Sequence, residues 1–191
     1  LTGLTPQKEY AMQYVVVRSD GVVKRISDLF SEKVLHSDDQ WEPMTVDPDL
    51  MPYPQEADGY ATVIQTGKPA FQWSDATLNF KRPNKNNLVI YELWVYDHTQ
   101  HRSIAGLMVR LQYFEDMGVN AIELMPITEF DGNENWGYSP NHYFALDKAY
   151  GTPEQMKTFV DECHKRGIAV ILDMVFNHST GLNPMNKLYP Y

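Results

Sequence analysis

Asp173, Asn177 and His178 are the residues whose types and spacing first indicate chemistry. They follow the apolar run 168–172, which has the length of a short strand. Strands that are apolar on both faces are typical of parallel sheets covered by helices, and in closed α/β barrels the functional residues lie where such strands end. A carboxylate, an amide and an imidazole can together bind a polar ligand there. We therefore interpret this segment as a barrel strand that leads to an active site.

Each of these residues also has a structural explanation when taken singly. Asp and His side chains near strand ends often bond neighbouring backbone groups without any ligand. Their occurrence together, beside an aromatic loop on the same edge of the predicted sheet, favours a ligand site.

The segment 127–151 is that aromatic loop. Strand-to-helix connections usually have about 2 to 6 residues, and much longer structured loops are commonly functional. Rings alternate here with amides and carboxylates, a mixture that suits carbohydrate, because ring faces pack on C–H groups while polar groups bond hydroxyls. The alternative is that the rings only anchor the loop by packing. The rings belong to Phe130, Trp136, Tyr138, Tyr143, Phe144 and Tyr150.

Metal-binding signals in the sequence are weak. Asn177 offers a carbonyl oxygen that suits calcium, but no acidic run of the EF-hand type accompanies it. The pairs 98/101 and 163/164, which are His with His and Cys with His, lack the spacing and companions of a zinc site. We expect no metal ligands and no cofactor, and we expect Cys163 to be a small buried apolar residue.

The elements that must position these residues alternate along the second half of the chain. We predict strands at 88–95 and 119–125 and a third strand starting at Ile168. Ser103 can cap one helix that Gly118 ends, and Thr152, Pro153 and Gln155 form a capping-box start for a second helix that ends at Gly167. The order of strand, helix, strand, helix, strand predicts a parallel sheet.

The first half of the chain is rich in β-strand signals. Two runs between residues 10 and 26 meet at Asp20-Gly21, which predicts a two-residue hairpin turn with positive φ at both positions. The stretch 38–58 is rich in Pro and acidic residues, and we expect it to be irregular. A further short strand is predicted at 60–66, and a polar connector at 81–87.

The overall charge narrows the class of partner. The 191 residues carry a formal net charge of −9, whereas nucleic acids and anionic membranes call for clustered Lys and Arg. We therefore expect no nucleic-acid and no membrane partner, and a neutral ligand fits better. No run reaches the ~18 apolar residues of a membrane helix. The sequence predicts no particular cellular location.

Three segments, in order, resemble glycoside hydrolase family 13, the α-amylase superfamily. The last of them, 173–178, is similar to the family's first signature, Asp-x-Val-x-Asn-His at the end of the third barrel strand. The part around Trp136 is most similar to the branching-enzyme, isoamylase and pullulanase subgroup. The segments are 118–126 (Gly-Val-Asn-Ala-Ile-Glu-Leu-Met-Pro), 136–144 (Trp-Gly-Tyr-Ser-Pro-Asn-His-Tyr-Phe) with 149–152 (Ala-Tyr-Gly-Thr), and 173–178 (Asp-Met-Val-Phe-Asn-His).

The resemblance implies an α/β fold, a partial (β/α)8 TIM barrel with its first three strands and two helices, preceded by a β-rich segment. Residues 1–35 would be the tail of an N-terminal β-sandwich module. Residues 36–86 would be a linker and irregular segment with a short strand, and 87–191 the first part of a catalytic barrel. Such an N-terminal fragment exposes a sheet edge and apolar faces, so we expect it to self-associate or to need the missing barrel half.

Members of this family cleave or transfer α-glucosidic bonds with retention, using two carboxyl groups roughly 5 Å apart. By resemblance, His178 would hydrogen-bond the sugar at the cleavage subsite, Tyr138 would stack on the same ring, and Asp173 would support their geometry. Asn177 would brace the following loop or, in calcium-dependent members, bind the ion. Trp136 is a further substrate-binding candidate.

The resemblance implies no catalytic residue in this chain, because the family's three carboxylates follow later strands. Asp131, Glu134 and Asp147 fall outside the matching motifs. The chain is thus expected to be an inactive fragment of an enzyme acting on α-glucan, either a hydrolase or a transglycosylase. One alternative is a non-catalytic homologue that binds a glucan or a protein partner. Another is a barrel enzyme for phosphorylated metabolites, which the aromatic loop favours less.

Overall fold

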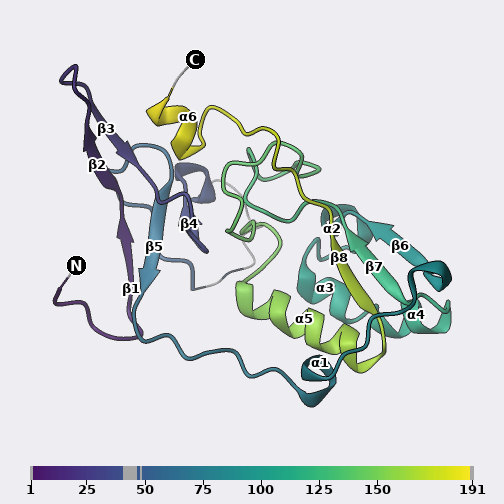
Figure 1. The fold of residues 1–191 in the computed structure, drawn as a ribbon. Helices are drawn as coiled ribbons and strands as arrows, with labels where there is room; N and C mark the ends of the chain where they lie inside the picture. The colour runs from purple at the N-terminus through teal and green to yellow at the C-terminus, as the bar shows by residue number, and fades with distance from the viewer. Residues whose placement is uncertain (1, 41–46, 48, 190–191) are drawn as a thin grey trace.

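The structure is a computed structural model that describes residues 2–40, 47 and 49–189 (Figure 1). Antiparallel strands from the first third of the chain form one layer, and a parallel sheet with its helices forms the other. The stretch predicted as irregular, 38–58, includes residues 41–46 and 48, which lie outside the described residues. No helix in the described part of the chain is long and apolar enough to cross a membrane.

The N-terminal layer contains two small antiparallel sheets, with the orders β1-β5-β4 and β2-β3. The strand predicted at 60–66 is confirmed as β5, and it lies between β1 and β4. It therefore joins the N-terminal strands in one sheet, although the sequence places it in the predicted linker segment 36–86. The strands are β1 (Glu9–Met12), β2 (Tyr14–Val17), β3 (Val23–Ile26), β4 (Val34–Leu35) and β5 (Ala61–Gln65), and the 3-10 helix η1 (Ser37–Gln40) follows β4.

The predicted β2–β3 hairpin is confirmed, but its turn is not the predicted two-residue turn. Arg18 N–H donates to the Val22 carbonyl at 2.9 Å, so the loop consists of residues 19–21. Gly21 alone of these has positive φ, at +83°. Asp20 Oδ1 accepts from Val22 N–H at 3.1 Å and fixes a longer loop with glycine in the left-handed position, which is another common hairpin connection.

The predicted parallel sheet is confirmed, with the order β6-β7-β8. Glu92 of β6 lies opposite Glu123 of β7, and Glu123 lies opposite Ile171 of β8. Because side chains alternate along a strand, this row faces away from the neighbouring residues Ile122 and Leu124, which are buried. The strands are β6 (Ile90–Leu93), β7 (Ala121–Leu124) and β8 (Ala169–Leu172), and the 3-10 helix η2 (Lys85–Asn87) precedes them.

The helix predicted between Ser103 and Gly118 is two helices in the structure. The break lies after α3, where Arg110 N–H bonds the Leu107 carbonyl at 2.9 Å in a tighter turn. Val109 at the break is β-branched and exposed, so neither propensity nor packing favours a continuous helix there. The helices are α1 (Asp75–Leu78), α2 (Val95–His98), α3 (Ile104–Met108), α4 (Leu111–Asp116), α5 (Pro153–Lys165) and α6 (Pro184–Leu188).

The capping box predicted for α5 is confirmed. Thr152 Oγ1 accepts from Gln155 N–H at 3.2 Å, and Gln155 Oε1 accepts from Thr152 N–H at 2.9 Å. At its other end, Gly167 has φ +72°. The helix packs against α3 and β8, which places its apolar face over the sheet.

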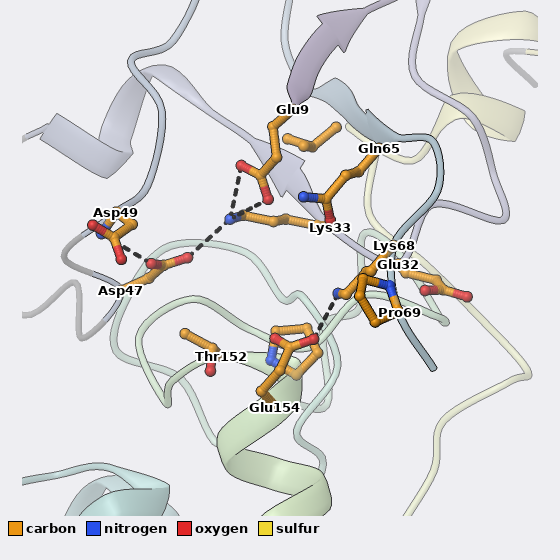
Figure 2. Close-up of a pocket in the computed structure, with 12 residues that line it drawn as sticks. Glu9, Glu32, Lys33, Asp47, Asp49, Gln65, Lys68, Pro69, Thr152 and Glu154 are labelled. Atoms are coloured by element: carbon orange, nitrogen blue, oxygen red, sulfur yellow. Dashed lines mark hydrogen bonds and ion pairs between the residues drawn. The ribbon is translucent and has the colours of Figure 1, made fainter. Parts of the chain in front are cut away.

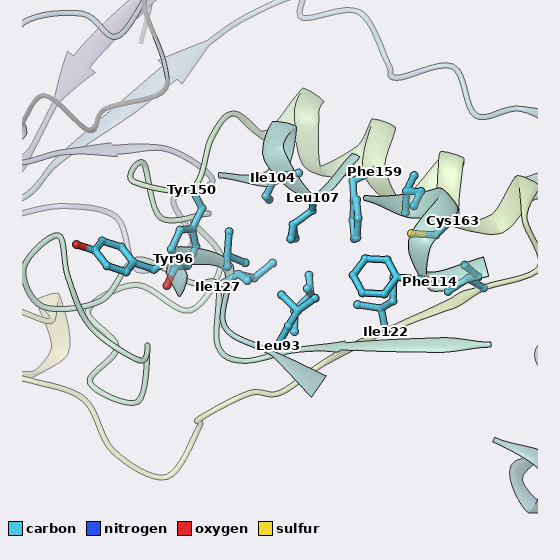
Figure 3. Packing of buried hydrophobic residues seen from close by; sticks show 14 of the residues in the cluster. Leu93, Tyr96, Ile104, Leu107, Phe114, Ile122, Ile127, Tyr150, Phe159 and Cys163 are labelled. Atoms are coloured by element: carbon cyan, nitrogen blue, oxygen red, sulfur yellow. The ribbon is translucent and has the colours of Figure 1, made fainter. Parts of the chain in front are cut away.

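The main hydrophobic core lies between the parallel sheet and α3, α4 and α5 (Figure 3). Ile104 and Leu107 of α3 and Leu111 and Phe114 of α4 are buried on this one face despite the break between the two helices. Cys163 is fully buried in this core, as predicted, and burial raises the pKa of its thiol to about 12. The fully buried members include Ile104, Leu107, Phe114, Ile122, Phe159 and Tyr150.

Candidate functional site

The candidate site forms where the chain leaves β8. Asp173 N–H donates to the Leu124 carbonyl at 3.0 Å, which keeps the chain beside the end of β7. The Tyr138 hydroxyl donates to Asp173 Oδ2 at 2.7 Å. These bonds bring the aromatic loop and the exit of β8 together.

His178 completes the cluster. Its Nε2 lies 2.7 Å from the backbone carbonyl oxygen of Tyr138. A carbonyl only accepts, so Nε2 carries the hydrogen, and Nδ1 stays available as an acceptor when the ring is neutral. The Tyr143 hydroxyl donates to the His178 carbonyl at 3.1 Å. His178 is exposed, so its ring is both oriented and accessible to a ligand.

Tyr138 is held in its protonated form. The hydrogen bond to Asp173 raises the pKa of Tyr138 to about 12, with smaller effects from burial and from the charges of Asp173, Glu92 and Glu123. The two glutamates come from the row of the sheet that faces away from the helices. The phenol therefore remains a hydrogen-bond donor at neutral pH, and its ring stays fixed against Asp173.

Gly137 shapes the turn that presents Tyr138 and Trp136. Its φ is +91°, and a Cβ built on it would lie 2.2 Å from the Pro126 carbonyl oxygen. Only glycine fits this position. The Asn135 side chain accepts from Gly137 N–H at 2.9 Å and fixes the turn further. Trp136 projects outward, with 62% of its surface exposed.

The five predicted substrate-binding residues therefore divide into two groups. Tyr138, Asp173 and His178 form one connected cluster. Trp136 and Asn177 lie close to this cluster in the chain and are exposed. Asn177 makes no hydrogen bond with the residues that the structure describes, so neither the bracing role nor the calcium role has a visible partner here.

The aromatic rings of the loop divide into a buried and an exposed group. Phe130 and Tyr150 are fully buried and pack against one another, with ring centroids 5.5 Å apart, so these rings anchor the loop. Trp136 and Phe144 are more than half exposed, and Phe144 also packs against Phe30 with ring centroids 5.4 Å apart. The anchoring rings thus hold in place a loop that leaves Trp136 exposed, and the carbohydrate interpretation stays a prediction.

The loop 127–151 also contains a buried charge cluster that the sequence does not predict. Lys148 Nζ bonds Glu129 Oε1 and lies 3.3 Å from Asp39 Oδ1. Burial raises the pKa of Glu129, which Lys148 opposes, and burial with the Glu129 charge raises the pKa of Asp147. Burial works against the charge of Lys148, but the neighbouring carboxylates raise its pKa. Charged residues in a loop look like surface residues, so only the tertiary structure shows this cluster.

Histidines outside the cluster have packing roles. His142 is fully buried, and burial lowers its pKa to about 3, so the ring is neutral. Its Nε2 lies 2.8 Å from Ser27 Oγ of the N-terminal layer. His98 stacks on Phe114 with ring centroids 5.3 Å apart, and His164 stacks on Phe80 at 3.9 Å.

A hollow of about 620 Å³ lies between the N-terminal layer and the start of α5 (Figure 2). Ion pairs cross it, including Lys33 with Glu9 at 3.1 Å and Lys68 with Glu154 at 2.6 Å. Among the described residues, its lining contains no aromatic side chain and no residue of the candidate site. The described lining therefore offers charged and polar groups and no ring face.

Comparison with known proteins adds independent information. The family profile described as "Alpha amylase, catalytic domain" matches residues 73–186. A malto-oligosyltrehalose trehalohydrolase from Saccharolobus solfataricus is 39% identical over 146 residues, which are 76% of this chain and 25% of that protein. A 1,4-alpha-glucan branching enzyme GlgB from Halothermothrix orenii is 43% identical over 82 residues, which are 43% of this chain and 13% of that enzyme. The chain spans a quarter or less of these relatives.

Solved structures agree with the family match. A Salmonella typhimurium protein assigned as an alpha amylase has a TM-score of 0.70 and 27% identity, covering 100% of this chain and 28% of that chain. The pullulanase SAP of Group B Streptococcus has a TM-score of 0.63 and 26% identity, covering 91% of this chain and 26% of that chain. The branching enzyme and the pullulanase fit the predicted subgroup, whereas the resembling segments do not predict the trehalohydrolase as a relative. The chain belongs to the α-amylase catalytic-domain family, glycoside hydrolase family 13, as its three signature segments predict.

Proposed function

We propose that this chain is a piece of a longer, retaining enzyme that hydrolyses or transfers α-glucosidic bonds, and that it carries the first part of the catalytic barrel. The single observation that carries the proposal is the connected cluster of Tyr138, Asp173 and His178 at the exit of β8. A fixed ring face and an oriented imidazole beside it match what a glucosyl ring requires. Family membership supports the reaction class.

In this proposal the parallel sheet is the start of a (β/α)8 barrel, and its chemistry belongs to the strand ends. Tyr138 stacks on the glucosyl ring, and Nδ1 of the neutral His178 ring accepts a hydrogen bond from a hydroxyl of the same sugar. Asp173 fixes the phenol. These groups orient the sugar and stabilise its flattened, cationic transition state, while attack and proton transfer belong to carboxylates elsewhere in the enzyme.

The substrate class proposed is a malto-oligosaccharide or a longer α-glucan. The printed names of the trehalohydrolase and branching-enzyme relatives both refer to α-linked glucose polymers or oligomers. The trehalohydrolase match extends over more of this chain than the branching-enzyme match, so malto-oligosyltrehalose is the first substrate to test. Release of trehalose from it would indicate hydrolysis, and new branches on amylose would indicate transfer.

A kinetic experiment tests the proposed role of the cluster. In the intact protein, His178→Ala should lower kcat on malto-oligosaccharides more than it raises KM, because a hydrogen bond that strengthens in the transition state acts on turnover. His101→Ala removes another exposed histidine outside the site and serves as the matched control. Equal kcat and KM values for His178→Ala and the control would show that His178 does not act in the substrate site.

A non-catalytic, glucan-binding or partner-binding homologue is the alternative. The coding sequence after residue 191 separates the two classes. Three carboxylates in the later strand-end motifs indicate an enzyme, and their replacement indicates a binding protein. Proton NMR of the first product then tests retention, because a retaining enzyme releases the α-anomer from an α-linked substrate.

We further propose that the 191-residue chain alone is inactive and associates with itself or with the remaining part of the barrel. Within the described residues, β6 and β8 each have one neighbouring strand. Ile90 and Leu172 on these edge strands are nearly half exposed, and Phe176 is 66% exposed. Open edges and apolar surface favour pairing. Light scattering after gel filtration tests this, and a compact monomer that binds no apolar dye would contradict it.

A further inference from the structure

Asn141 lies fully buried at the centre of a hydrogen-bond network that joins three separate parts of the chain. Its Nδ2 donates to the Tyr60 hydroxyl at 3.0 Å, and its Oδ1 accepts from Thr180 Oγ1. Its backbone carbonyl accepts from Asn183 Nδ2 at 2.8 Å, and its backbone N–H donates to the Glu129 carbonyl at 2.7 Å. One buried amide thus contacts the N-terminal layer and the segment that follows β8.

The segment that carries His178 is fixed on both sides of that residue. Before it, the Asp173 carboxylate accepts from Tyr138. After it, Thr180 N–H donates to the Pro140 carbonyl at 3.2 Å, and Thr180 Oγ1 reaches Asn141. The ring of His178 is therefore placed on the Tyr138 carbonyl by a segment whose far end is tied to Asn141.

Tyr60 connects this network to the N-terminal layer. It immediately precedes β5, and it is 3% exposed. Its hydroxyl accepts from Asn141 and donates to the Phe130 carbonyl at 3.3 Å. Since buried polar networks rigidify when each member is satisfied, Tyr60 gives Asn141 a fixed orientation.

We propose that Asn141 is a positioning residue. Through Thr180 it fixes the position of His178 relative to Tyr138, and through Tyr60 it makes that position depend on the N-terminal layer. The proposal rests on the proposed function for its kinetic readout. Asn141 is fully buried and cannot itself touch a sugar, so its effect must pass through His178 and Tyr138. Misplacement of a positioned group by about 1 Å can lower turnover on the order of 100-fold.

A pair of substitutions at Thr180 tests the first link in the intact protein. Thr180→Val keeps the shape of the side chain and removes its hydroxyl, whereas Thr180→Ser keeps the hydroxyl. We expect Thr180→Val to lower kcat on malto-oligosaccharides by at least about 10-fold, within the range for misplaced groups, and Thr180→Ser to retain most of it. Thr158→Val is the matched control, because Thr158 Oγ1 bonds the Glu154 carbonyl at 2.8 Å on α5, away from the site.

The combination with His178→Ala separates positioning from general destabilisation. If Thr180 acts through His178, Thr180→Val should change kcat by less than about 2-fold in the His178→Ala background, as coupling within one network predicts. An equal loss in both backgrounds would overturn the proposal. Tyr60→Phe should lower kcat, as Thr180→Val does. An unchanged kcat for Tyr60→Phe would show that the N-terminal layer does not affect the position of His178.

A spectroscopic readout keeps the inference testable if the protein does not act on α-glucans. In protein labelled with 13C-histidine, the His178 ring resonance is identified by its loss in His178→Ala. Thr180→Val and Tyr60→Phe should both move this resonance, while Thr158→Val should not. An unmoved resonance would refute the positioning role, whereas a moved resonance without activity would refute only the proposed function.

Discussion

Gly137→Ala is the substitution whose consequence follows most directly from the backbone of the site. Gly137 has φ +91°, and an added Cβ would lie 2.2 Å from the Pro126 carbonyl oxygen and 2.8 Å from Pro126 Cβ. Both neighbours belong to the chain just after β7, which cannot move without disturbing the sheet. Gly132 in the same loop offers a matched control, because its φ is +74° and a Cβ there would meet nothing within 4 Å.

The two substitutions share one energetic term and differ in another. A left-handed backbone costs an L-residue roughly 1–2 kcal/mol, and this applies at both positions. Gly137→Ala adds an overpacking term of roughly 1–3 kcal/mol because backbone or proline must shift. We therefore expect about 1–2 kcal/mol of destabilisation for Gly132→Ala and about 2–5 kcal/mol for Gly137→Ala.

Urea unfolding of both variants in the intact protein measures the difference, with one probe and one buffer. Malto-oligosaccharide turnover gives a second readout. Gly137→Ala displaces the adjacent Tyr138 and should lower kcat, while Gly132→Ala should leave turnover unchanged. Equal destabilisation and equal turnover for the two variants would refute the argument that the carbonyl contact requires glycine at 137.

Three further changes follow from the structure. Lys148→Met leaves the Glu129 carboxylate buried without its cation, which should destabilise the protein by about 3–5 kcal/mol at pH 7. Because burial raises the pKa of Glu129, this loss of stability should be smaller at pH 5. Thermal unfolding that shows the same loss at both pH values would contradict the predicted pH dependence. Thr152→Ala removes the cap of α5 and should lower the unfolding free energy by about 1 kcal/mol in urea titrations, with Thr158→Ala as the control inside the helix. EDTA tests the expectation that no cofactor is needed: turnover of malto-oligosaccharides should stay unchanged, and restoration of lost activity by calcium would show that a metal site exists.

Local signals in the sequence predict the α/β layer well, because each of its elements is specified by nearby residues. The capping box at Thr152, the glycine at 167 and the apolar run before Asp173 act within a few residues of one another. The sequence does not predict the break between α3 and α4, because the helical spacing of apolar residues continues across Val109. In the structure Val109 is exposed, so no packing contact holds the helix together there. The longer turn at Gly21 is missed because Asp-Gly is compatible with more than one loop length.

The same distinction between local and long-range signals applies to the candidate site. Residue types and family motifs indicate Tyr138, Asp173 and His178, and the structure places the three in contact. The network around Asn141 has no such signal, because a buried amide in a loop has the same sequence appearance as an exposed one. Its partners, Tyr60 and Thr180, lie 81 and 39 residues away along the chain. The contact with Tyr60 depends on the docking of the N-terminal layer, and the contact with Thr180 depends on how the segments after β7 and β8 meet. The support of this site is therefore a tertiary property, while its binding groups are indicated by local signals.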